Sequence, residues 1–202
     1  AMESAEIRTA EGNRYTVFSL WDTYRNLHQL LTLVYPERQL EMVRSMVGMY
    51  REWGWLPKWE LYGRETFTME GDPSIPVIVD TWMKGLRDFD MDAAYEAMRK
   101  SATTPGARNR MRPDIDPYIE KGYVPLGFYA RDLSGDNSVS HALEYYIADH
   151  ALSLLADSLG KKDDAALFRA RSLGYKNYYS TESGTFRPIT KEGKFLTPFD
   201  PR

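Results

Sequence analysis

Four residues near the amino terminus combine an aromatic ring with groups that bind hydroxyls. A tryptophan, an aspartate, an arginine and a histidine follow one another at spacings of one, three and three: Trp21, Asp22, Arg25 and His28. On a helix they would share one face, where the indole can stack on a sugar ring and the polar groups can hydrogen-bond its hydroxyls. The pattern predicts a carbohydrate-binding face. It also fits an Asp22–Arg25 ion pair beside a Trp21 ring packed in the core.

Further acidic residues follow along the chain. Trp59 and Glu60 place a ring beside a carboxylate, and Asp80 and Lys84 form an i, i+4 pair. Because the residues around this pair are apolar, we expect its helix to be buried, and buried charges need partners that cluster at sites. On a solvated surface the same pair would be an ordinary helix-stabilising pair.

Two more carboxylates, Glu144 and Asp149, occur within a strong apolar helix pattern, and each also fits a surface position. No local metal site is predicted, because the three histidines are far apart and the chain has no cysteine. The acidic spacing of residues 132–137 resembles a calcium loop but lacks the closing glutamate, so it predicts a polar turn.

Helical periodicity dominates the elements that must position these residues. Helices are expected at 17–34, 36–54, 76–88, 91–102, 138–159 and 163–179. Glycines at 54 and 160 end two of them. The connections at 55–74 and 103–137 are long enough to carry function, and short extended pieces are expected near 186–188 and 195–197. The predicted class is all-α.

Composition excludes several classes of function. The 202 residues are 43% hydrophobic with a net charge of −3, which indicates a globular chain without a nucleic-acid or anionic-membrane partner. No apolar run reaches the ~18 residues of a membrane span. The first residues lack the pattern of a signal peptide. Five Trp and 14 Tyr are many for this length and are compatible with sugar binding or with a large helical core.

Seven sequence runs, in the same order, resemble glycoside hydrolase family 92, the calcium-dependent exo-α-mannosidases. They are Phe-Ser-Leu-Trp-Asp-Thr-Tyr-Arg at 18–25, Gly-Trp-Leu-Pro-Lys-Trp-Glu at 54–60, Met-Glu-Gly-Asp at 69–72, Lys-Gly at 84–85, Gly-Tyr-Val-Pro at 122–125, Ser-Val-Ser with Leu-Glu-Tyr at 138–145, and Phe-Asp-Pro at 199–201. A Gly-aromatic-aliphatic-Pro pattern occurs in two of these runs and fits a repeated helix–loop–helix toroid.

The resemblance implies that residues 1–202 are a single segment of an (α/α)6 barrel, whose amino-terminal β-sandwich and second half are not in this chain. It implies an inverting exo-α-1,2-mannosidase with a calcium cofactor whose ligands are not identified, mannose-containing oligosaccharides as partners, a role in N-glycan degradation, and a secreted or periplasmic parent protein. The expected substrate-binding residues are Trp21, Asp22, Arg25, Trp59, Glu60, Asp80, Lys84 and Glu144.

The resemblance assigns no catalytic residue to this chain. The family's acid and base lie in segments that would follow the Phe-Asp-Pro run, and neither is present, so we expect the isolated chain to be inactive and to self-associate through exposed barrel edges. Three alternatives stay open: a diverged module that binds carbohydrate or a protein without catalysis, a helical-repeat scaffold, and another α/α-toroid glycosidase with a different sugar.

Overall fold

The computed structural model describes residues 1–10, 12–128 and 137–200, which form two compact units. The first unit is Ala1–Thr103 and the second is Thr104–Arg202. The predicted polar turn at 132–137 lies, apart from Asn137, outside the described residues.

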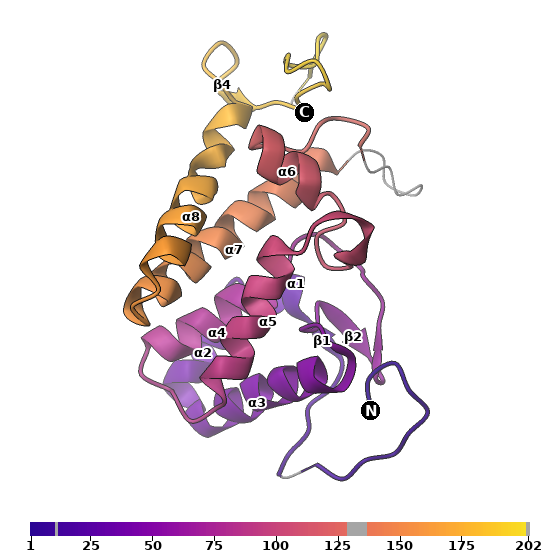
Figure 1. Ribbon diagram of the computed structural model, residues 1–202, viewed down its shortest axis with the longest axis vertical. Helices are drawn as coiled ribbons and strands as arrows, with labels where there is room; N and C mark the ends of the chain where they lie inside the picture. Colours follow the sequence, from indigo (N-terminus) through magenta and orange to yellow (C-terminus); the bar gives the residue numbers. More distant parts are fainter. Residues whose placement is uncertain (11, 129–136, 201–202) are drawn as a thin grey trace. The chain divides into compact units, whose positions relative to one another are not determined.

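Five helices build the first unit, α1 Leu20–Thr23, α2 Leu27–Val34, α3 Pro36–Trp53, α4 Ser74–Met83 and α5 Met91–Thr103 (Figure 1). Helix α3 begins at a proline, whose missing N–H is not needed in the first turn, and ends at Gly54 in the left-handed conformation at φ 91°. Buried apolar side chains of α3, α4 and α5 form the core, among them Val43, Met46, Ile75, Ile78 and Met98. The prediction of α3 is confirmed.

A small antiparallel sheet lies beside these helices. Strand β1 (Phe18–Ser19) pairs with β2 (Trp59–Leu61), and β2 pairs with β3 (Arg64–Glu65). The β2–β3 turn places Tyr62 and Gly63 at φ 52° and 82°, the left-handed pattern of a two-residue hairpin turn. The connection expected at 55–74 therefore contains an ordered hairpin at 59–65.

The prediction of one continuous helix at 17–34 is wrong. Val17 is left-handed at φ 63°, residues 18–19 form β1, and Tyr24 ends the single turn of α1 before α2 begins at Leu27. Pairing with β2, more than 40 residues away in sequence, overrides the local apolar period. The expected helix carried Val17, Leu27 and Val34 on its apolar side, and these side chains are 49%, 42% and 52% exposed.

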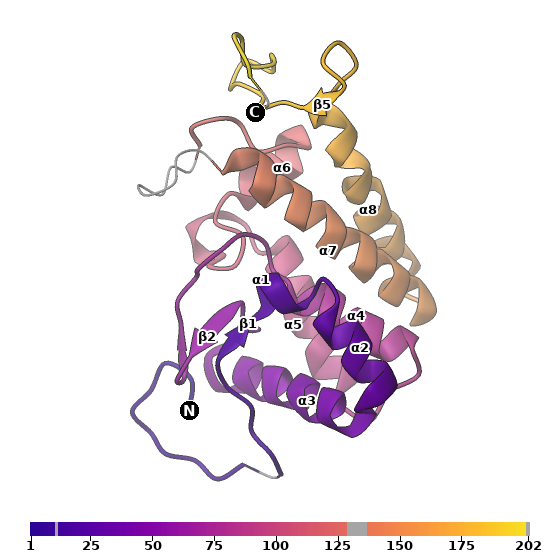
Figure 2. The ribbon, with the colours of Figure 1, turned by 180° about the vertical axis from the view of Figure 1, so that it is seen from behind.

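Among its described residues the second unit contains three α-helices, α6 Ile115–Lys121, α7 Ser138–Ser158 and α8 Lys162–Ser172. Helices α7 and α8 run side by side, as both views show (Figures 1 and 2). Its other elements are the 3-10 helices η1 Gly106–Arg108 and η2 Leu173–Tyr178 and the hairpin β4 Tyr179–Ser180 with β5 Thr185–Phe186. Helix α6 was missed within the expected connection at 103–137.

Aromatic rings fill the core of the second unit. Tyr118, Tyr145, Tyr146 and Tyr178 are buried together with Val124. The Tyr118 ring meets the Tyr145 ring edge-on, with centroids 5.3 Å apart. The tyrosines that made carbohydrate binding plausible from composition therefore serve, in this unit, largely as core. Among the described residues, no helix has both the length and the apolar character that crossing a bilayer requires.

Candidate functional site

The turn from β1 into α1 places the first predicted site residues beside the β2 strand. Ser19 lies opposite Trp59 in the sheet, and the Leu20 amide donates to the Lys58 carbonyl at 3.1 Å. The single turn of α1, which carries Trp21 and Asp22, therefore starts at the edge of the Trp59 strand. Two runs that lie more than 30 residues apart in sequence are brought together by this pairing.

Arg25 forms a stack with two aromatic rings at the end of α1. Its guanidinium carbon lies 4.3 Å from the Trp21 ring centroid and 4.9 Å from the Tyr24 centroid, and its Nη1 donates to the Tyr24 hydroxyl at 3.2 Å. Such cation–π contacts fix a flexible side chain over a flat surface. The Trp21 ring is half-buried.

The carboxylate of Asp22 is exposed. Within the described part of the chain it makes no hydrogen bond and no ion pair, so the alternative of an Asp22–Arg25 ion pair is wrong. Arg25 is instead held by the two rings. This leaves an accessible acceptor next to a planar aromatic and cationic surface, which is an arrangement able to bind a sugar.

Trp59 is half-buried, and its backbone is fixed by a buried glutamate. The Glu65 carboxylate accepts hydrogen bonds from the amides of Lys58 at 2.7 Å, Trp59 at 3.0 Å and Phe67 at 2.9 Å. Glu65 was not predicted as a functional residue. It lies in a hairpin, where the sequence shows no helical periodicity that would have indicated its burial.

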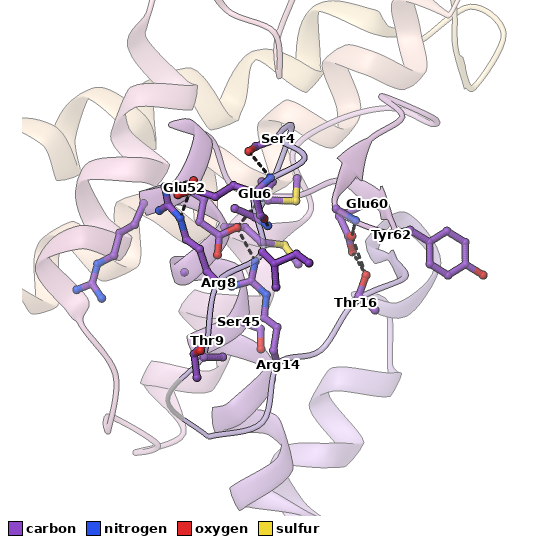
Figure 3. Close-up of a pocket in the computed structure, with 18 of the residues that line it drawn as sticks. Ser4, Glu6, Arg8, Thr9, Arg14, Thr16, Ser45, Glu52, Glu60 and Tyr62 are labelled. Carbon is purple, nitrogen blue, oxygen red and sulfur yellow. Dashed lines mark hydrogen bonds and ion pairs between the residues drawn. The ribbon is translucent and has the colours of Figure 1, made fainter.

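Glu60 is fully buried and binds the chain itself. Its carboxylate accepts hydrogen bonds from the Thr16 hydroxyl at 2.7 Å, from the Val17 amide at 2.8 Å and from the Gly63 amide. Figure 3 shows Glu60 directed toward Thr16, whereas the exposed Tyr62 ring points away from it. In this arrangement Glu60 holds the left-handed Val17 in front of β1, and the sugar contact predicted for it stays a prediction.

His28 does not share an exposed face with Trp21 and Asp22. Its ring is 3% exposed and lies between the Thr23 hydroxyl, 3.0 Å from Nε2, and the Gln39 amide oxygen, 2.9 Å from Nδ1. Burial lowers the pKa of His28, and the hydrogen bond to Gln39 raises it by less. The expectation of a sugar-binding imidazole is contradicted, because the break between α1 and α2 turns the ring inward.

Asp80 and Lys84 form the predicted pair, with Oδ2 and Nζ 2.7 Å apart. Their side chains are 31% and 34% exposed, so the pair is not buried as expected. Helix α4 buries Val77, Ile78 and Val79, but it ends in the exposed Met83 and Lys84. The expectation of a buried helix is thus confirmed for most of α4, whereas the i, i+4 pair near its carboxyl end is partly exposed. The sugar contact predicted for Asp80 and Lys84 stays a prediction.

Glu144 lies on α7 of the second unit and is half-buried. One turn and a half further on, Asp149 is fully buried at the centre of an ionic cluster that the sequence did not reveal. Its carboxylate pairs with Arg112 at 2.8 Å and Arg171 at 2.9 Å and accepts the Tyr118 hydroxyl at 2.8 Å. An aspartate within a long, largely apolar helix was the available signal, since a buried charge requires a partner.

A second buried polar group in this unit joins Asp114, His141 and Tyr145. The Tyr145 hydroxyl donates to Asp114 at 2.6 Å, and His141 Nδ1 lies 3.1 Å from the same carboxylate. Burial acts to raise the pKa of Asp114, but the hydrogen bond and charge of His141, with the Tyr145 hydroxyl, hold the pKa below its ordinary value. These groups bind one another and connect α7 to the chain ahead of α6.

A pocket of about 960 Å³ lies in the first unit between the amino-terminal segment and α3 (Figure 3). Glu60 is the predicted site residue that it contains. Four of its charged side chains form two ion pairs, Arg8 with Glu6 at 2.6 Å and Arg14 with Glu52 at 2.9 Å. Because the Trp21–Asp22 face is not part of it, this pocket is separate from the predicted sugar-binding site.

The described ranges contain no group of three or more histidine, aspartate or glutamate side chains able to hold a metal ion. Glu60 and Glu65, the carboxylates nearest to the Trp21–Asp22 face in the sheet, are occupied by backbone amides.

Comparison with known proteins identifies relatives for nearly the whole chain. Residues 2–202 match the profile described as the glycosyl hydrolase family 92 catalytic domain. A protein of Arthroderma benhamiae called an uncharacterized secreted glycosidase is 28% identical over 162 residues, which is 78% of this chain and 21% of that protein.

Two solved structures from Bacteroides thetaiotaomicron have the same fold. A family GH92 inverting mannosidase is 32% identical with a TM-score of 0.85, over 94% of this chain and 25% of that one. A family GH92 α-mannosidase in complex with mannoimidazole is 37% identical with a TM-score of 0.85, over 97% of this chain and 25% of that one. The chain thus spans about a quarter of the length of these relatives, and the predicted fold class, all-α and part of an (α/α)6 barrel, is confirmed.

Proposed function

Because this chain belongs to glycosyl hydrolase family 92, we propose that it is part of an exo-acting, inverting α-1,2-mannosidase and supplies groups that bind the terminal mannose. The observation that carries this proposal is the Trp21–Arg25 stack beside the exposed, unpaired Asp22 carboxylate among the described residues. The ring and guanidinium offer a flat surface for the C–H face of a pyranose, and Asp22 accepts hydrogen bonds from its hydroxyls.

The catalytic acid and base are proposed to come from outside residues 1–202. Inversion requires two carboxyl groups about 6.5–9.5 Å apart, one protonating the leaving oxygen and the other activating a water. Glu60 and Glu65 do not suit either task, because backbone amides and a hydroxyl already bind their oxygens. The sequence also lacks the segments in which the resemblance places the acid and the base.

Calcium is the proposed cofactor of the parent enzyme, and its ligands are proposed to lie outside the described residues, which do not bring a metal-binding group together. Mannose-containing oligosaccharides such as N-glycans are the proposed substrates. The relative from Arthroderma benhamiae, called secreted, supports export of the parent protein.

Two measurements on the purified chain test this function. Titration with α-1,2-mannobiose should show binding, and Asp22→Asn and Trp21→Ala should each weaken it at least ten-fold, whereas Asp157→Asn on the exposed side of α7 should not. Release of mannose, followed with calcium and with a chelator, should be absent. Calcium-dependent release would contradict the placement of the acid and base, and an absence of binding would contradict the sugar-binding role.

A second candidate function is an interaction module without catalysis. It is favoured by the exposed apolar side of α2, where Leu30, Leu33 and Val34 are each more than half exposed. Such a surface promotes self-association. Sedimentation of the wild-type chain should then reveal oligomers that Leu33→Glu dissociates, while a wild-type monomer that binds the sugar would remove the basis of this candidate.

A further inference from the structure

Four helices of the first unit are joined by one chain of side-chain hydrogen bonds. It starts at the Val77 carbonyl in α4 and passes through the Thr81 hydroxyl at 2.7 Å, the Gln39 amide nitrogen at 2.9 Å and the Gln39 amide oxygen to His28 Nδ1 at 2.9 Å. From His28 Nε2 it continues to the Thr23 hydroxyl at 3.0 Å. Thr81 and Gln39 are fully buried and His28 is 3% exposed, so water does not compete within the chain of bonds.

The direction of each hydrogen bond follows from the first. A carbonyl only accepts, so the single Thr81 hydroxyl proton points at Val77 and the Thr81 oxygen accepts from the Gln39 amide nitrogen. The Gln39 oxygen therefore faces His28, and since it only accepts, His28 Nδ1 carries the proton. In the neutral ring Nε2 is then an acceptor, and the Thr23 hydroxyl donates to it.

Thr23 is the last residue of α1, the turn that carries Trp21 and Asp22. A helix of four residues has almost no stability of its own, so its orientation depends on what holds its ends. Its start is fixed by the bond from Leu20 to Lys58, and its end by the bond of Thr23 to His28. The hydroxyl has one other acceptor, the Ser19 carbonyl at a longer 3.3 Å.

We propose that His28, Gln39 and Thr81 are positioning residues, which hold Thr23 as a donor and thereby orient the Trp21–Asp22 face toward the sugar. This rests on the proposed function. The helices of the core thus determine the geometry of the site through a fixed imidazole tautomer. The residues act through Thr23 and do not themselves contact the sugar.

The first test is the tautomer of His28, measured by nitrogen-15 NMR on the labelled chain, with the signal assigned by its loss in His28→Gln. We expect a protonated Nδ1 and an unprotonated Nε2 at pH 7.5. A proton on Nε2 would overturn the proposal, because Nε2 would then donate to Thr23.

The second test removes the donor at the end of the chain of bonds. Thr23→Val keeps the shape of the side chain and should weaken binding of α-1,2-mannobiose about five- to ten-fold, the usual effect of one lost hydrogen bond. Thr23→Ser, which keeps the hydroxyl, should restore binding to within about two-fold of wild type. Equal affinities of Thr23→Val and wild type would overturn the proposal.

The Trp21 indole resonance reports the position of α1 whether or not the sugar binds. It is assigned with Trp21→Phe, and it should move in Thr23→Val while the resonances of the other four tryptophans stay in place. An unmoved Trp21 resonance in Thr23→Val would overturn the positioning role. If Thr23→Val loses its signals generally because it does not fold, Thr23→Ser keeps the test valid, since it must give the wild-type spectrum. If the wild-type chain binds no mannobiose but the Trp21 resonance moves as expected, the proposed function fails and the chain of bonds stands.

A third test changes the donors and acceptors in the chain of hydrogen bonds with little change in side-chain volume. Gln39→Glu replaces the amide nitrogen that donates to Thr81 by an acceptor and places a negative charge beside His28, which favours a protonated ring. The Trp21 resonance should then move as in Thr23→Val, and a neutral His28 with an unmoved Trp21 resonance would contradict the proposal.

Discussion

Two buried glutamates in the β2–β3 hairpin illustrate how the surroundings of a side chain decide its role. Glu60 and Glu65 are 0% and 6% exposed, and both carboxylates accept hydrogen bonds from backbone amides. A carboxylate in that setting supports local backbone that the amino-acid types alone do not favour, such as the left-handed Val17. At the residue scale Glu60 connects the hairpin to the segment before β1, and Glu65 fixes the backbone of Lys58, whose carbonyl accepts the Leu20 amide.

Glu60→Gln should destabilise the chain by about 2 kcal/mol, because an amide nitrogen would replace one acceptor oxygen and face a donor. Urea unfolding measures the change in the free energy of unfolding. Asp22→Asn is the matched control, because Asp22 is exposed and unpaired within the described ranges, and it should stay within about 0.5 kcal/mol of wild type. Equal stabilities of the two variants would contradict the supporting role of Glu60.

The lowered pKa of His28 predicts a pH dependence of stability. The unfolded chain binds a proton at His28 near the ordinary pKa of about 6.5, whereas the folded chain binds it only at lower pH. The contribution of this group to stability is therefore fully present above pH about 6.5 and is lost as the pH falls toward the folded pKa.

Free energies of unfolding from urea titrations between pH 7.5 and pH 5 check this dependence. The fall in stability should be smaller in His28→Gln than in wild type. The lowered pKa of Asp114 does not interfere, since its contribution is lost only below the ordinary carboxyl range. Parallel curves for wild type and variant would show that the folded chain protonates His28 as readily as the unfolded one.

At the scale of elements, the end of α3 depends on one glycine. Gly54 adopts φ 91°, its amide donates to the Tyr50 carbonyl at 2.7 Å, and its carbonyl accepts Lys100 Nζ at 2.8 Å. Gly54→Ala should cost about 1 kcal/mol or more, because a side chain is disfavoured in this conformation and its Cβ would lie 3.3 Å from Lys100 Nζ.

Gly48 provides the matched comparison within the same helix. Its φ is not left-handed, and a Cβ there would meet only the far end of the flexible Arg14 side chain. Gly48→Ala should therefore be neutral or stabilise by up to about 1 kcal/mol, the ordinary helix preference for alanine. Thermal unfolding should show a lowered midpoint for Gly54→Ala and an unchanged or raised midpoint for Gly48→Ala, and midpoints lowered equally in both variants would contradict the capping argument.

Local signals predicted those elements whose causes are local. Helix α3 has a proline at its start and a glycine at its end, and α5 follows the apolar period closely. Helix α7 has the predicted bounds to within one residue, although it buries Asp149 and exposes Ile147. The start of the chain has a different cause, since β1 exists only through pairing with β2, and that pairing interrupts a stripe that reads as one helix. For the same reason His28 was assigned to an exposed face, although the break in the helix turns it into the core.

In the predicted site, too, local sequence patterns did not reveal the features that depend on tertiary contacts. The proximity of the Trp21 turn to the Trp59 strand was accessible through family resemblance, because spacing in sequence does not reveal which strands pair. The partners of Asp149 were inaccessible, since Arg112 and Arg171 come from separate segments whose meeting depends on tertiary packing. A buried aspartate signals only that partners exist.

At the scale of the whole molecule, the two compact units rest on different kinds of core. The first unit is built around aliphatic and methionine side chains of α3, α4 and α5, whereas the second packs four tyrosines together, and two of them, Tyr118 and Tyr145, lie against a buried ionic cluster. Removing one member of such a cluster destabilises the fold more than removing one member of a surface pair does, because the remaining charges stay buried away from water.

Asp149→Asn should therefore destabilise the second unit by about 3–5 kcal/mol, since Arg112 would stay buried opposite a neutral group. Asp157→Asn on the same helix removes an exposed ion pair with Lys162 and should leave the free energy of unfolding almost unchanged. Native-state hydrogen exchange resolves the effect by unit: amides of α7 and α8 should lose protection in Asp149→Asn, and those of α3 report on the first unit. Similar protection of α7 in both variants would mean that the cluster contributes no more than a surface pair, whereas an equal loss in α3 would mean that the two units open together.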